Sequence, residues 1–312
     1  MKILFIIDPI EKLIPYKDTT VMMMQDTCRR GWNTYIATLN DLLIDNGQAY
    51  AYATELTTAQ NQALWYQLKE NKKSNTTDFD FILMRKEPPF DMEFVYSTYI
   101  LDIAEKNGTP VINSPAALRN YNEKCHITHF PEFTPLTLIT KKKEELLEFI
   151  NKHENTIIKP LDGMGGASIF RVKKGDPNTN VILETITNYF TNYVMAQIFN
   201  PEIKNGDKRI LIVNGKPLDY VLARIPAKND FRGNIAAGAT TKVQPISPRN
   251  KEIADTVGKH LKKHNVLFAG IDLIGDTMTE INITCPTCAR EIFNDKGVDA
   301  TKLLFDALEN KE

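Results

Sequence analysis

Residues 156–172 read TIIKPLDGMGGASIFRV, two β-branched, strand-like runs joined by a glycine-rich loop. Glycines let the backbone approach a ligand closely and turn its N–H groups towards anionic oxygens, so this loop is suited to holding phosphates. It lacks the G-x-x-x-x-G-K-[ST] pattern of a P-loop, and it leads into a strand-like run instead of the helix of a dinucleotide loop. Lys159 precedes the glycines, whereas the lysine of a protein kinase follows them. A simple glycine-rich hairpin is the alternative.

A second segment, residues 270–284 with the sequence GIDLIGDTMTEINIT, predicts a β-hairpin that turns at a Gly-Asp pair. Glu280 and Asn282 are two residues apart in a strand, so their side chains face the same way, and the hairpin brings Asp272 opposite them. Two carboxylates among isoleucines and leucines repel each other and lose solvation, which a cation would offset. Because Mg²⁺ prefers carboxylate and amide oxygens, these residues are candidate magnesium ligands. A hairpin whose polar residues face solvent is the alternative.

A phosphate loop and a magnesium site together are what a phosphoryl-transfer site needs. Four basic residues between them are candidates for neutralising phosphoryl charge: Lys208, Arg209, Arg224 and Arg232. Arg209 and Arg224 fall in strand-like runs that Asn214-Gly215 joins as a hairpin. Planar guanidinium groups suit bidentate phosphate contacts. An exposed surface charge is the alternative for each, and Arg224, within an apolar run, is the stronger candidate.

The first 120 or so residues alternate β-rich runs with amphipathic stretches, which predicts an α/β domain with a largely parallel sheet. We expect strands at residues 2–7, 32–38, 80–84 and 111–112 and helices at residues 19–30, 93–106 and 141–151. A further helix is expected to start at Ser114-Pro115 and to run towards Lys124. Asn46-Gly47 predicts a hairpin turn.

The loop after the strand at residues 80–84 begins with Arg85, at the carboxyl end of a parallel strand, where open α/β sheets bind ligands. The pattern of the sequence changes from Leu136, and we place a domain boundary before it, near residue 122. Residues 227–241 hold Gly, Asn, Ala and Thr with few large apolar side chains, and we expect them to form a mobile loop.

The length and charge of the chain limit its possible partners. With 312 residues there is room for two domains. Lys and Arg total 38 against 39 Asp and Glu, a net charge of −1, which gives no positive field to hold a nucleic acid. The apolar run at residues 3–7 ends at Asp8-Pro9, too short for a signal peptide, and no run approaches the roughly 18 residues of a transmembrane helix. We expect a cytoplasmic protein that binds neither nucleic acid nor a membrane.

Cysteines and histidines give little support for other chemistry. The 4 cysteines are too few for a disulfide framework in a chain of this length. Cys285-Pro286-Thr287-Cys288 has the spacing of a redox or half-zinc motif, but no second pair completes a four-ligand site. His126 and His129 lie in a predicted helix without a partner cluster, which favours a structural role. The sequence contains neither a nucleophile elbow nor H-E-x-x-H, so a hydrolase is not expected.

The order of Lys124, Lys159, the glycine-rich loop, Asp272 and Glu280-x-Asn282 resembles the ATP-grasp superfamily. Longer stretches look like the bacterial glutathione synthetase family: residues 84–91 (MRKEPPFD), 159–172, 223–226 (ARIP), 232–238 (RGNIAAG) and 280–284 (EINIT). The likeness covers essentially the whole chain.

This resemblance implies an α/β, Rossmann-like substrate domain at residues 1–122, followed by an ATP-grasp domain of α+β class at residues 123–312. The second domain would divide into a central subdomain at about residues 123–200 and a C-terminal subdomain at about residues 201–312. Residues 227–241 would be a lid that keeps water from a reactive intermediate. The family also implies a homotetramer.

The activity implied is the ligation of γ-glutamylcysteine to glycine, with ATP cleaved to ADP and phosphate, which gives glutathione in the second step of its biosynthesis. The dipeptide carboxylate would first become an acyl phosphate, an activated acid that the amine of glycine can attack. Two Mg²⁺ ions, which Mn²⁺ can replace, would assist. Another ATP-grasp carboxylate–amine ligase and an ATP-binding regulatory protein on the same fold are the alternatives.

By the same resemblance, residues 163–168 close over the ATP phosphates. The nucleotide-binding set is Lys124, Lys159, Asp162, Gly163, Gly165, Gly166, Ala196, Gln197, Ile198 and Asp207. The metal ligands are Asp272, Glu280 and Asn282, and the catalytic arginines are Arg209, Arg224 and Arg232. The dipeptide site is formed by Arg85, Asn282, Cys285, Pro286 and Thr287. Two departures stand out: Cys285 where relatives usually carry Ser, and Ala239-Thr240-Thr241 where relatives are richer in glycine.

Overall fold

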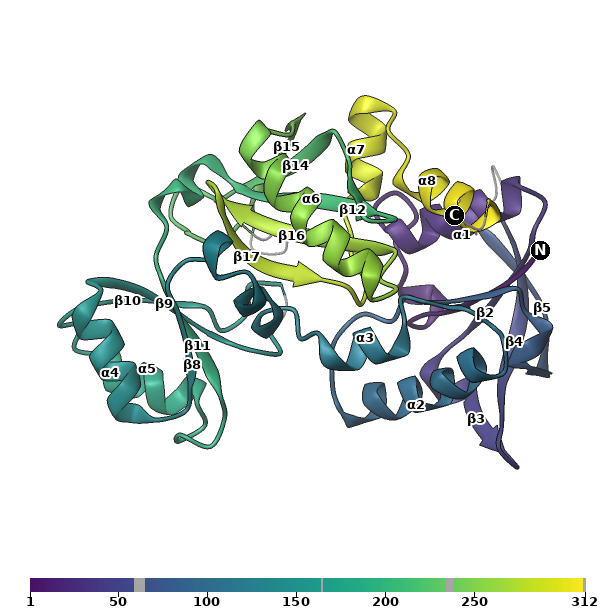
Figure 1. The fold of residues 1–312 in the computed structure, drawn as a ribbon, viewed down its shortest axis with the longest axis horizontal. Helices are drawn as coiled ribbons and strands as arrows, with labels where there is room; N and C mark the ends of the chain where they lie inside the picture. The colour runs from purple at the N-terminus through teal and green to yellow at the C-terminus, as the bar shows by residue number, and fades with distance from the viewer. Residues whose placement is uncertain (59–64, 164, 234–237, 311–312) are drawn as a thin grey trace.

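The computed structural model describes residues 1–58, 65–163, 165–233 and 238–310. In these ranges the strands form three sheets that follow one another along the chain. In Figure 1 the third sheet lies between the other two. None of the helices in these ranges is long and apolar enough to cross a membrane.

The first sheet has a parallel centre with the strand order β2-β1-β6-β7. These strands are β1 (Lys2–Ile6), β2 (Asn33–Ala37), β6 (Phe81–Met84) and β7 (Val111–Ile112). Three antiparallel strands extend the sheet: β3 (Leu42–Asp45), β4 (Gln48–Thr58) and β5 (Tyr66–Asn75). Asn46 and Gly47 both have positive φ in the turn between β3 and β4, as a two-residue hairpin requires. The predicted parallel sheet and its hairpin are confirmed.

Strand β1 is buried on both faces because its alternate side chains enter two different cores. The helices that cover the sheet are α1 (Thr19–Arg29), α2 (Met92–Lys106), α3 (Pro115–Asn120) and α8 (Ala300–Glu309). Leu4 and Ile6 belong to the core that includes α2 and α3. Ile3 and Phe5 belong to the core that includes α1 and α8. The first and last helices of the chain therefore pack on the same side of this sheet (Figure 1).

Helix α3 is shorter than the sequence predicts. It ends at Asn120, whereas the expected helix ran towards Lys124. The side chain of Asn122 accepts hydrogen bonds from the backbone N–H groups of Lys124 and Cys125. These bonds replace helical ones and start a new 3-10 turn. The 3-10 turns are η1 (Ile10–Lys12), η2 (Leu39–Asp41), η3 (Thr76–Asp78), η4 (Cys125–His129), η5 (Pro131–Phe133) and η6 (Pro201–Asn205).

The second sheet is antiparallel, with the order β10-β9-β11-β8. Its elements are β8 (Thr137–Thr140), α4 (Lys143–Lys152), β9 (Asn155–Pro160), β10 (Phe170–Lys173), α5 (Thr179–Ile186) and β11 (Val194–Ile198). Leu146 of α4 and Leu183 of α5 pack with Ile158 in a separate core. Since side chains alternate along β9, Ile157 and Lys159 are turned to the opposite face, where they line a pocket.

The third sheet has the order β15-β14-β12-β16-β17, with β13 beside β12. Its strands are β12 (Asp207–Val213), β13 (Lys216–Pro217), β14 (Tyr220–Ile225), β15 (Thr240–Pro245), β16 (Phe268–Ile274) and β17 (Thr277–Asn282), and α6 (Pro248–Lys263) and α7 (Ala289–Lys296) accompany them. Thr240 and Thr241, which the sequence assigned to the loop, are strand residues that pair with Ile225 and Arg224. The ladder to β14 therefore shortens the predicted loop at its C-terminal end.

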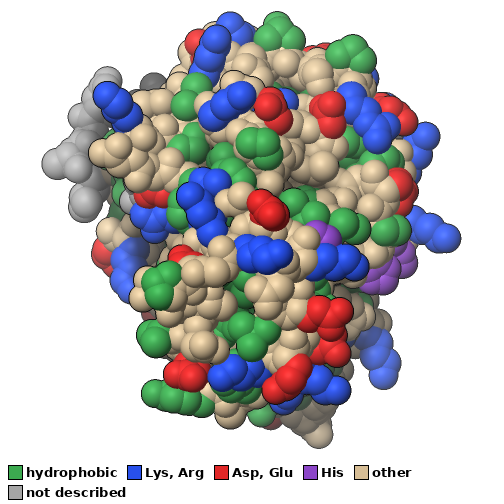
Figure 2. Space-filling model, turned by 90° about the vertical axis from the view of Figure 1, so that its left-hand side faces the viewer, with side chains coloured by type: hydrophobic (Ala, Val, Ile, Leu, Met, Phe, Trp, Pro, Cys, Tyr) green, Lys and Arg blue, Asp and Glu red, His purple; other side chains and the backbone are tan. Residues whose placement is uncertain are grey.

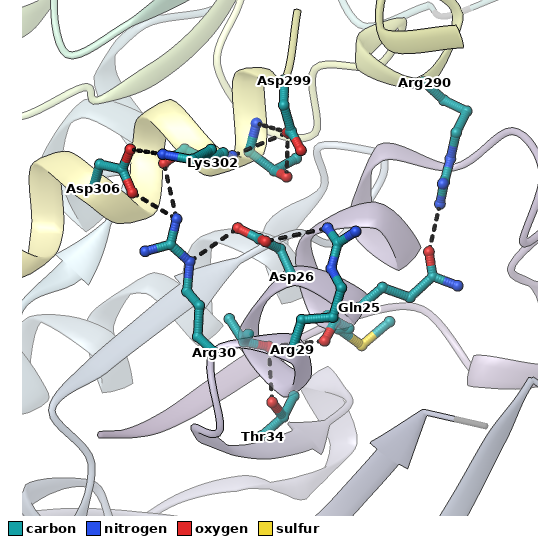
Figure 3. A network of polar contacts seen from close by, with 12 residues as sticks. Gln25, Asp26, Arg29, Arg30, Thr34, Arg290, Asp299, Lys302 and Asp306 are labelled. Atoms are coloured by element: carbon teal, nitrogen blue, oxygen red, sulfur yellow. Dashed lines mark hydrogen bonds and ion pairs between the residues drawn. The ribbon is translucent and has the colours of Figure 1, made fainter. Parts of the chain in front are cut away.

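Two polar joints connect the N-terminal sheet and its helix α1 to the C-terminal part of the chain. Arg30, which follows α1, donates hydrogen bonds to Asp26 at 3.1 Å and to Asp306 of α8 at 2.7 Å (Figure 3). Asn113, which follows β7, donates to the carbonyls of Phe268 and Ile283, both at 2.7 Å. These bonds fix the N-terminal sheet against the third sheet and α8.

Candidate active site

Two adjoining pockets lie along the third sheet, the first between it and the second sheet and the second between it and the loop that follows β6. The first, about 700 Å³, is lined by Lys159, Gln197 and Asp207 among others. The second, about 1070 Å³, is lined by Asp272, Asn282 and residues that follow β17. Glu280 lines both. The Glu280 carboxylate therefore lies at the boundary between the two pockets, where ligands bound in each would be in contact.

The three predicted metal ligands converge as expected. Strands β16 and β17 pair with Asp272 opposite Glu280 and with Gly270 opposite Asn282. The Nδ2 of Asn282 is 3.3 Å from the Oδ2 of Asp272. Asn282 thus keeps its amide oxygen for another partner, and the predicted hairpin is confirmed.

Asp272 is held by two arginines. Arg209 forms a two-pronged contact, with Nε at 2.5 Å from Oδ1 and Nη2 at 2.9 Å from Oδ2, and the Nη2 of Arg224 is 3.0 Å from Oδ2. Burial alone would raise the pKa of the Asp272 carboxyl, but Arg209 and Arg224 outweigh burial and hold that pKa well below its usual range. Asp272 is therefore a buried, permanently charged carboxylate.

Asp207 lines the first pocket, and one of its carboxylate oxygens has no hydrogen-bond partner among the described residues. Its Oδ2 accepts a hydrogen bond from Arg224 at 2.5 Å. Its Oδ1 is buried without a hydrogen-bond partner among the described residues. Burial raises the pKa of this carboxyl to about 7, although Arg224 opposes the rise. A buried oxygen without a partner beside a pocket is a place where a ligand hydroxyl would bind.

Two buried lysines approach the same region from different elements. Lys124, which precedes η4, donates to the carbonyl of Gly163 at 2.6 Å and lies 3.7 Å from the Oε1 of Glu280. Lys159 of β9 donates to the carbonyl of Thr279 at 3.3 Å. Burial lowers the pKa of Lys159. Both ammonium groups are thus placed beside Glu280, where an anionic ligand would find them.

The glycine-rich loop is turned tightly and touches the predicted lid. Gly165, Gly166 and Ser168 all have positive φ. The two glycines adopt this conformation without strain because they have no Cβ. The Nη1 of Arg232 donates to the carbonyl of Gly166 at 3.3 Å, while Asp230 holds the same guanidinium at 2.7 Å. Of the predicted loop and lid, residues 164 and 234–237 lie outside the described residues.

The other predicted nucleotide-binding residues are placed differently from one another. Gln197 and Ile198 line the first pocket, and the side chain of Gln197 donates to Thr137 at 2.9 Å. Ala196 is buried in the core behind β11. Asp162 is exposed beside the glycine-rich loop and is not among the described residues that line either pocket.

The predicted dipeptide residues divide into those that face the second pocket and those that support it. Cys285 and Thr287 line the pocket. Arg85 is buried and donates to the carbonyl of Pro286 at 2.9 Å and to Thr20 at 3.2 Å. Burial raises the pKa of the Cys285 thiol. Arg85 therefore positions the segment that carries Cys285.

Sequence reasoning missed several residues of the second pocket. These are Lys17, Asp18, Glu87, Pro88, Glu123, Thr284 and Glu291. Glu123 accepts a hydrogen bond from Thr284 at 3.0 Å, and burial raises the pKa of the Glu123 carboxyl. Two signals in the sequence could have indicated pocket residues. Glu123 directly precedes Lys124, and Glu87 lies within the family-like stretch at residues 84–91.

His126 and His129 have histidine neighbours that the sequence does not reveal, although no group of three or more His, Cys, Asp or Glu among the described residues could hold a metal ion. The ring of His126 lies 4.7 Å from that of His129 and 5.2 Å from that of His260 on α6, and the ring of His264 lies 4.6 Å from that of His260. The separation of 134 residues between His126 and His260 hides this cluster from any local pattern.

Comparison with known proteins finds relatives that match over the full length of this chain. Two family models match the chain, the prokaryotic glutathione synthetase N-terminal domain at residues 1–119 and the prokaryotic glutathione synthetase ATP-grasp domain at residues 123–297. The glutathione synthetase of Vibrio cholerae is 48% identical over 311 residues, which cover 100% of this chain and 98% of that protein. That of Escherichia coli O6:H1 is 47% identical over 309 residues, 99% of this chain and 98% of that protein.

Solved structures share the fold at low identity. The ATP-grasp ligase PsnB, complexed with a phosphomimetic variant of its minimal precursor, Mg and ADP, has a TM-score of 0.64 at 17% identity and covers 99% of this chain and 97% of its own. D-alanyl-alanine synthetase A from Vibrio cholerae has a TM-score of 0.62 at 12% identity, with 99% and 97% covered. These likenesses concern the fold alone.

Proposed function

This chain belongs to the prokaryotic glutathione synthetase family, and from that premise we propose how its residues perform the reaction. The function is that of a glutathione synthetase, an ATP-grasp ligase that joins γ-glutamylcysteine to glycine as ATP is cleaved. ATP-grasp ligases bind ATP with Mg²⁺. The observation that carries the residue assignment is the position of Glu280, which lines both pockets.

We place the nucleotide in the first pocket. Its apolar wall, with Ile157, Ile198 and Phe231, suits an adenine ring. The buried, unpartnered Oδ1 of Asp207 would accept a hydrogen bond from a ribose hydroxyl. Lys159 in the same pocket and Lys124 at its edge would neutralise the phosphates.

The metal ligands would be Asp272, Glu280 and Asn282. The amide oxygen of Asn282 and the partly exposed carboxylate of Glu280 are ligands of the kind that Mg²⁺ prefers. The Oδ1 of Asp272 accepts one hydrogen bond, from Arg209, and so keeps a further lone pair for an ion. When bound, Mg²⁺ supplies neutralisation of charge on the transferring phosphoryl group. Glu280 would hold the ion at the boundary between nucleotide and acid.

The second pocket would hold the dipeptide with its carboxylate towards Glu280. Arg209 and Arg224 line this pocket and would stabilise charge as the phosphoryl group passes to the carboxylate. The resulting acyl phosphate would react with the amine of glycine and release phosphate. Cys285 and Thr287 would contact the dipeptide, and Arg85 would hold their segment in place.

Water exclusion would depend on the loop after β14. We propose residues 227–239, the part of the predicted loop that precedes β15, as the lid, with Arg232 linking it to the glycine-rich loop through the carbonyl of Gly166. Excluding water would prevent hydrolysis of the acyl phosphate before the amine attacks.

The finer properties of the family are part of this proposal. We assign residues 1–122 to the substrate domain and residues 123–312 to the ATP-grasp domain. Two Mg²⁺ ions, replaceable by Mn²⁺, a homotetramer and a cytoplasmic location come from the resemblance. Light scattering of the purified protein would test the tetramer.

The decisive experiment measures ADP release with MgATP, γ-glutamylcysteine and glycine, omitting each in turn, with mass detection of the tripeptide. ADP and glutathione appearing together only in the complete mixture support the proposal. ADP without tripeptide would mean a different acceptor, and MgATP binding without turnover would mean a regulatory protein.

A further inference from the structure

The side chain of Gln197 in the first pocket belongs to a short series of hydrogen bonds. Gln197 of β11 lies opposite Thr137 of β8, and directly opposite residues of an antiparallel pair have their side chains on the same face. The Nε2 of Gln197 donates to the Oγ1 of Thr137 at 2.9 Å. The hydroxyl of Thr137 donates in turn to the carbonyl of Pro135 at 2.7 Å. An amide, a hydroxyl and a backbone carbonyl are therefore connected in one direction.

This series fixes which end of the Gln197 amide meets Thr137. A hydroxyl group has one proton to donate, and a backbone carbonyl can only accept. The Thr137 proton is used by the carbonyl of Pro135, so the Thr137 oxygen can act only as an acceptor towards Gln197. Gln197 must then present its NH₂ group to Thr137, and its amide oxygen, Oε1, is left for another partner.

The Gln197 side chain lies on the face of the second sheet that forms the nucleotide pocket. Gln197 is 3% exposed, and it lines the first pocket together with Pro135 and Ile157. Ile157 of β9 is its directly opposite neighbour on the other side of β11. Among the described residues, the bond to Thr137 is the hydrogen bond that this side chain makes. Its Oε1 is therefore free to accept a hydrogen bond from a ligand in the pocket.

An acceptor in this place distinguishes purines by the group at C6. Adenine carries an amino group there, which is a donor, whereas guanine carries a carbonyl oxygen, which is an acceptor. Hypoxanthine has the same carbonyl oxygen. An amino group would donate to the Oε1 of Gln197, but a carbonyl oxygen would face it with no proton between them, and both would lose a hydrogen bond. An amide turned the other way would favour the carbonyl oxygen.

We propose that Thr137 is a positioning residue that makes the nucleotide pocket select 6-aminopurine over 6-ketopurine nucleotides, by holding the Gln197 amide in one orientation. This inference rests on the proposed placement of the nucleotide in the first pocket. Thr137 is not among the described residues that line that pocket, so it acts through Gln197 and not by touching the base. Its loss should change which nucleotide binds.

The test measures the dissociation constants of ADP and of inosine diphosphate, each with Mg²⁺, by calorimetry on the full-length protein. We expect the unmodified protein to bind ADP at least about 100-fold more tightly than inosine diphosphate. Thr137→Val keeps the shape of the side chain and removes the hydroxyl, so the Gln197 amide can turn. That ratio of affinities should then fall by roughly tenfold or more. Thr137→Ser keeps the hydroxyl and should retain the ratio of the unmodified protein.

Thr156→Val is the matched control. Thr156 of β9 alternates with Ile157, so its side chain is turned away from the pocket. Its Oγ1 is buried without a hydrogen-bond partner among the described residues, and we expect this change to leave the ratio unaltered. On the side of the molecule with the second sheet, Lys and Arg side chains are interspersed with Asp and Glu (Figure 2). This face therefore has no patch of one sign that would hold diphosphates outside the pocket.

Three results would overturn the proposal: equal ratios in Thr137→Val and the unmodified protein, a ratio in Thr137→Ser as low as that in Thr137→Val, or an equal fall in Thr156→Val. Nucleotide binding is measured without γ-glutamylcysteine or glycine, so these results do not depend on which amide the protein forms. An unmodified protein that binds neither diphosphate would overturn both this proposal and the placement of the nucleotide.

Discussion

Substitution of Glu280 is the most direct test of the proposed mechanism. Glu280→Gln removes a charge without changing the shape of the side chain, so we expect an unchanged thermal midpoint and a loss of turnover on the order of 10² to 10³. The measurement is ADP release at limiting and saturating Mg²⁺. Glu148→Gln, at an exposed position of α4, is the control. Near-normal turnover of Glu280→Gln at limiting Mg²⁺ would remove Glu280 from the metal site.

Arg224 serves two buried carboxylates, and its loss should affect folding as well as catalysis. Its Nη2 is 2.5 Å from Asp207 and 3.0 Å from Asp272. Arg224→Met leaves Asp207 without its cation, which should lower the free energy of unfolding by about 3–5 kcal/mol. Adding Asp207→Asn should restore part of that loss. Urea unfolding of the single and double variants measures both changes in free energy. If Arg224→Met were as stable as the unmodified protein, the ion pair of Arg224 with Asp207 would not be essential for folding.

At the scale of residues, the sequence predicts contacts that follow from local strand alternation. It does not predict contacts between residues that are far apart in the chain. The side-by-side placement of Asp272, Glu280 and Asn282 follows from strand alternation and a two-residue turn. The ion pair of Arg209 with Asp272 spans 63 residues, and no local pattern announces it. The same holds for His126 and His260.

At the scale of elements, the contact between the loop after β14 and the glycine-rich loop predicts a coupling defect. Arg232→Ala removes the hydrogen bond to Gly166, so water should reach the intermediate more often. We expect more ADP per tripeptide formed than in the unmodified protein. Arg249→Ala, which removes an exposed ion pair with Glu252 on α6, should leave the ratio unchanged. An unaltered ratio in Arg232→Ala would remove Arg232 from the lid.

The joint between α1 and α8 predicts a pH dependence of stability. Hydrogen bonds from Lys302 and Arg30 lower the pKa of Asp306 (Figure 3). A carboxyl whose pKa is lower in the folded state stabilises the fold above its unfolded pKa, and this contribution is lost as pH falls through the folded pKa. Asp306→Asn should therefore lower the thermal midpoint at pH 7 by about 1–2 °C, with a difference that shrinks below about pH 4. A difference independent of pH would contradict the assignment.

Element boundaries were predictable where a cap or turn residue stands at them. Asp91 caps α2 through the backbone N–H of Phe94 at 2.9 Å, in agreement with the expected start. The early end of α3 depends on the side chain of Asn122, which competes with the helix for backbone donors. The strand at Thr240 depends on pairing with β14, which only the folded sheet reveals.

At the scale of the molecule, the core on the α1 side of the N-terminal sheet draws on both ends of the chain. Phe305 of α8 is fully buried and meets Trp32 edge-on at 5.5 Å. Phe305→Ala should lower the free energy of unfolding by about 3–5 kcal/mol, whereas Leu303→Ala, which is 46% exposed, should change it by less than about 0.5 kcal/mol. Tryptophan fluorescence, from Trp32 and Trp65, during urea unfolding measures both changes in free energy. Equal effects of the two changes would mean that α8 is not part of this core.

The sequence predicts the class of each domain, because parallel strands with helices and antiparallel hairpins carry different local patterns. It does not predict that α8, which follows the third sheet, packs on the first sheet, because this return depends on the complementary surfaces of Ile3, Phe5 and Phe305.

The packing of α8 against α1 also has a consequence for synthesis on the ribosome. The apolar face formed by Ile3 and Phe5 is synthesised long before residues 300–309, which form part of its cover. A nascent chain therefore carries an incompletely covered apolar face until α8 has been made, and a product that stops short of α8 exposes that face to aggregation.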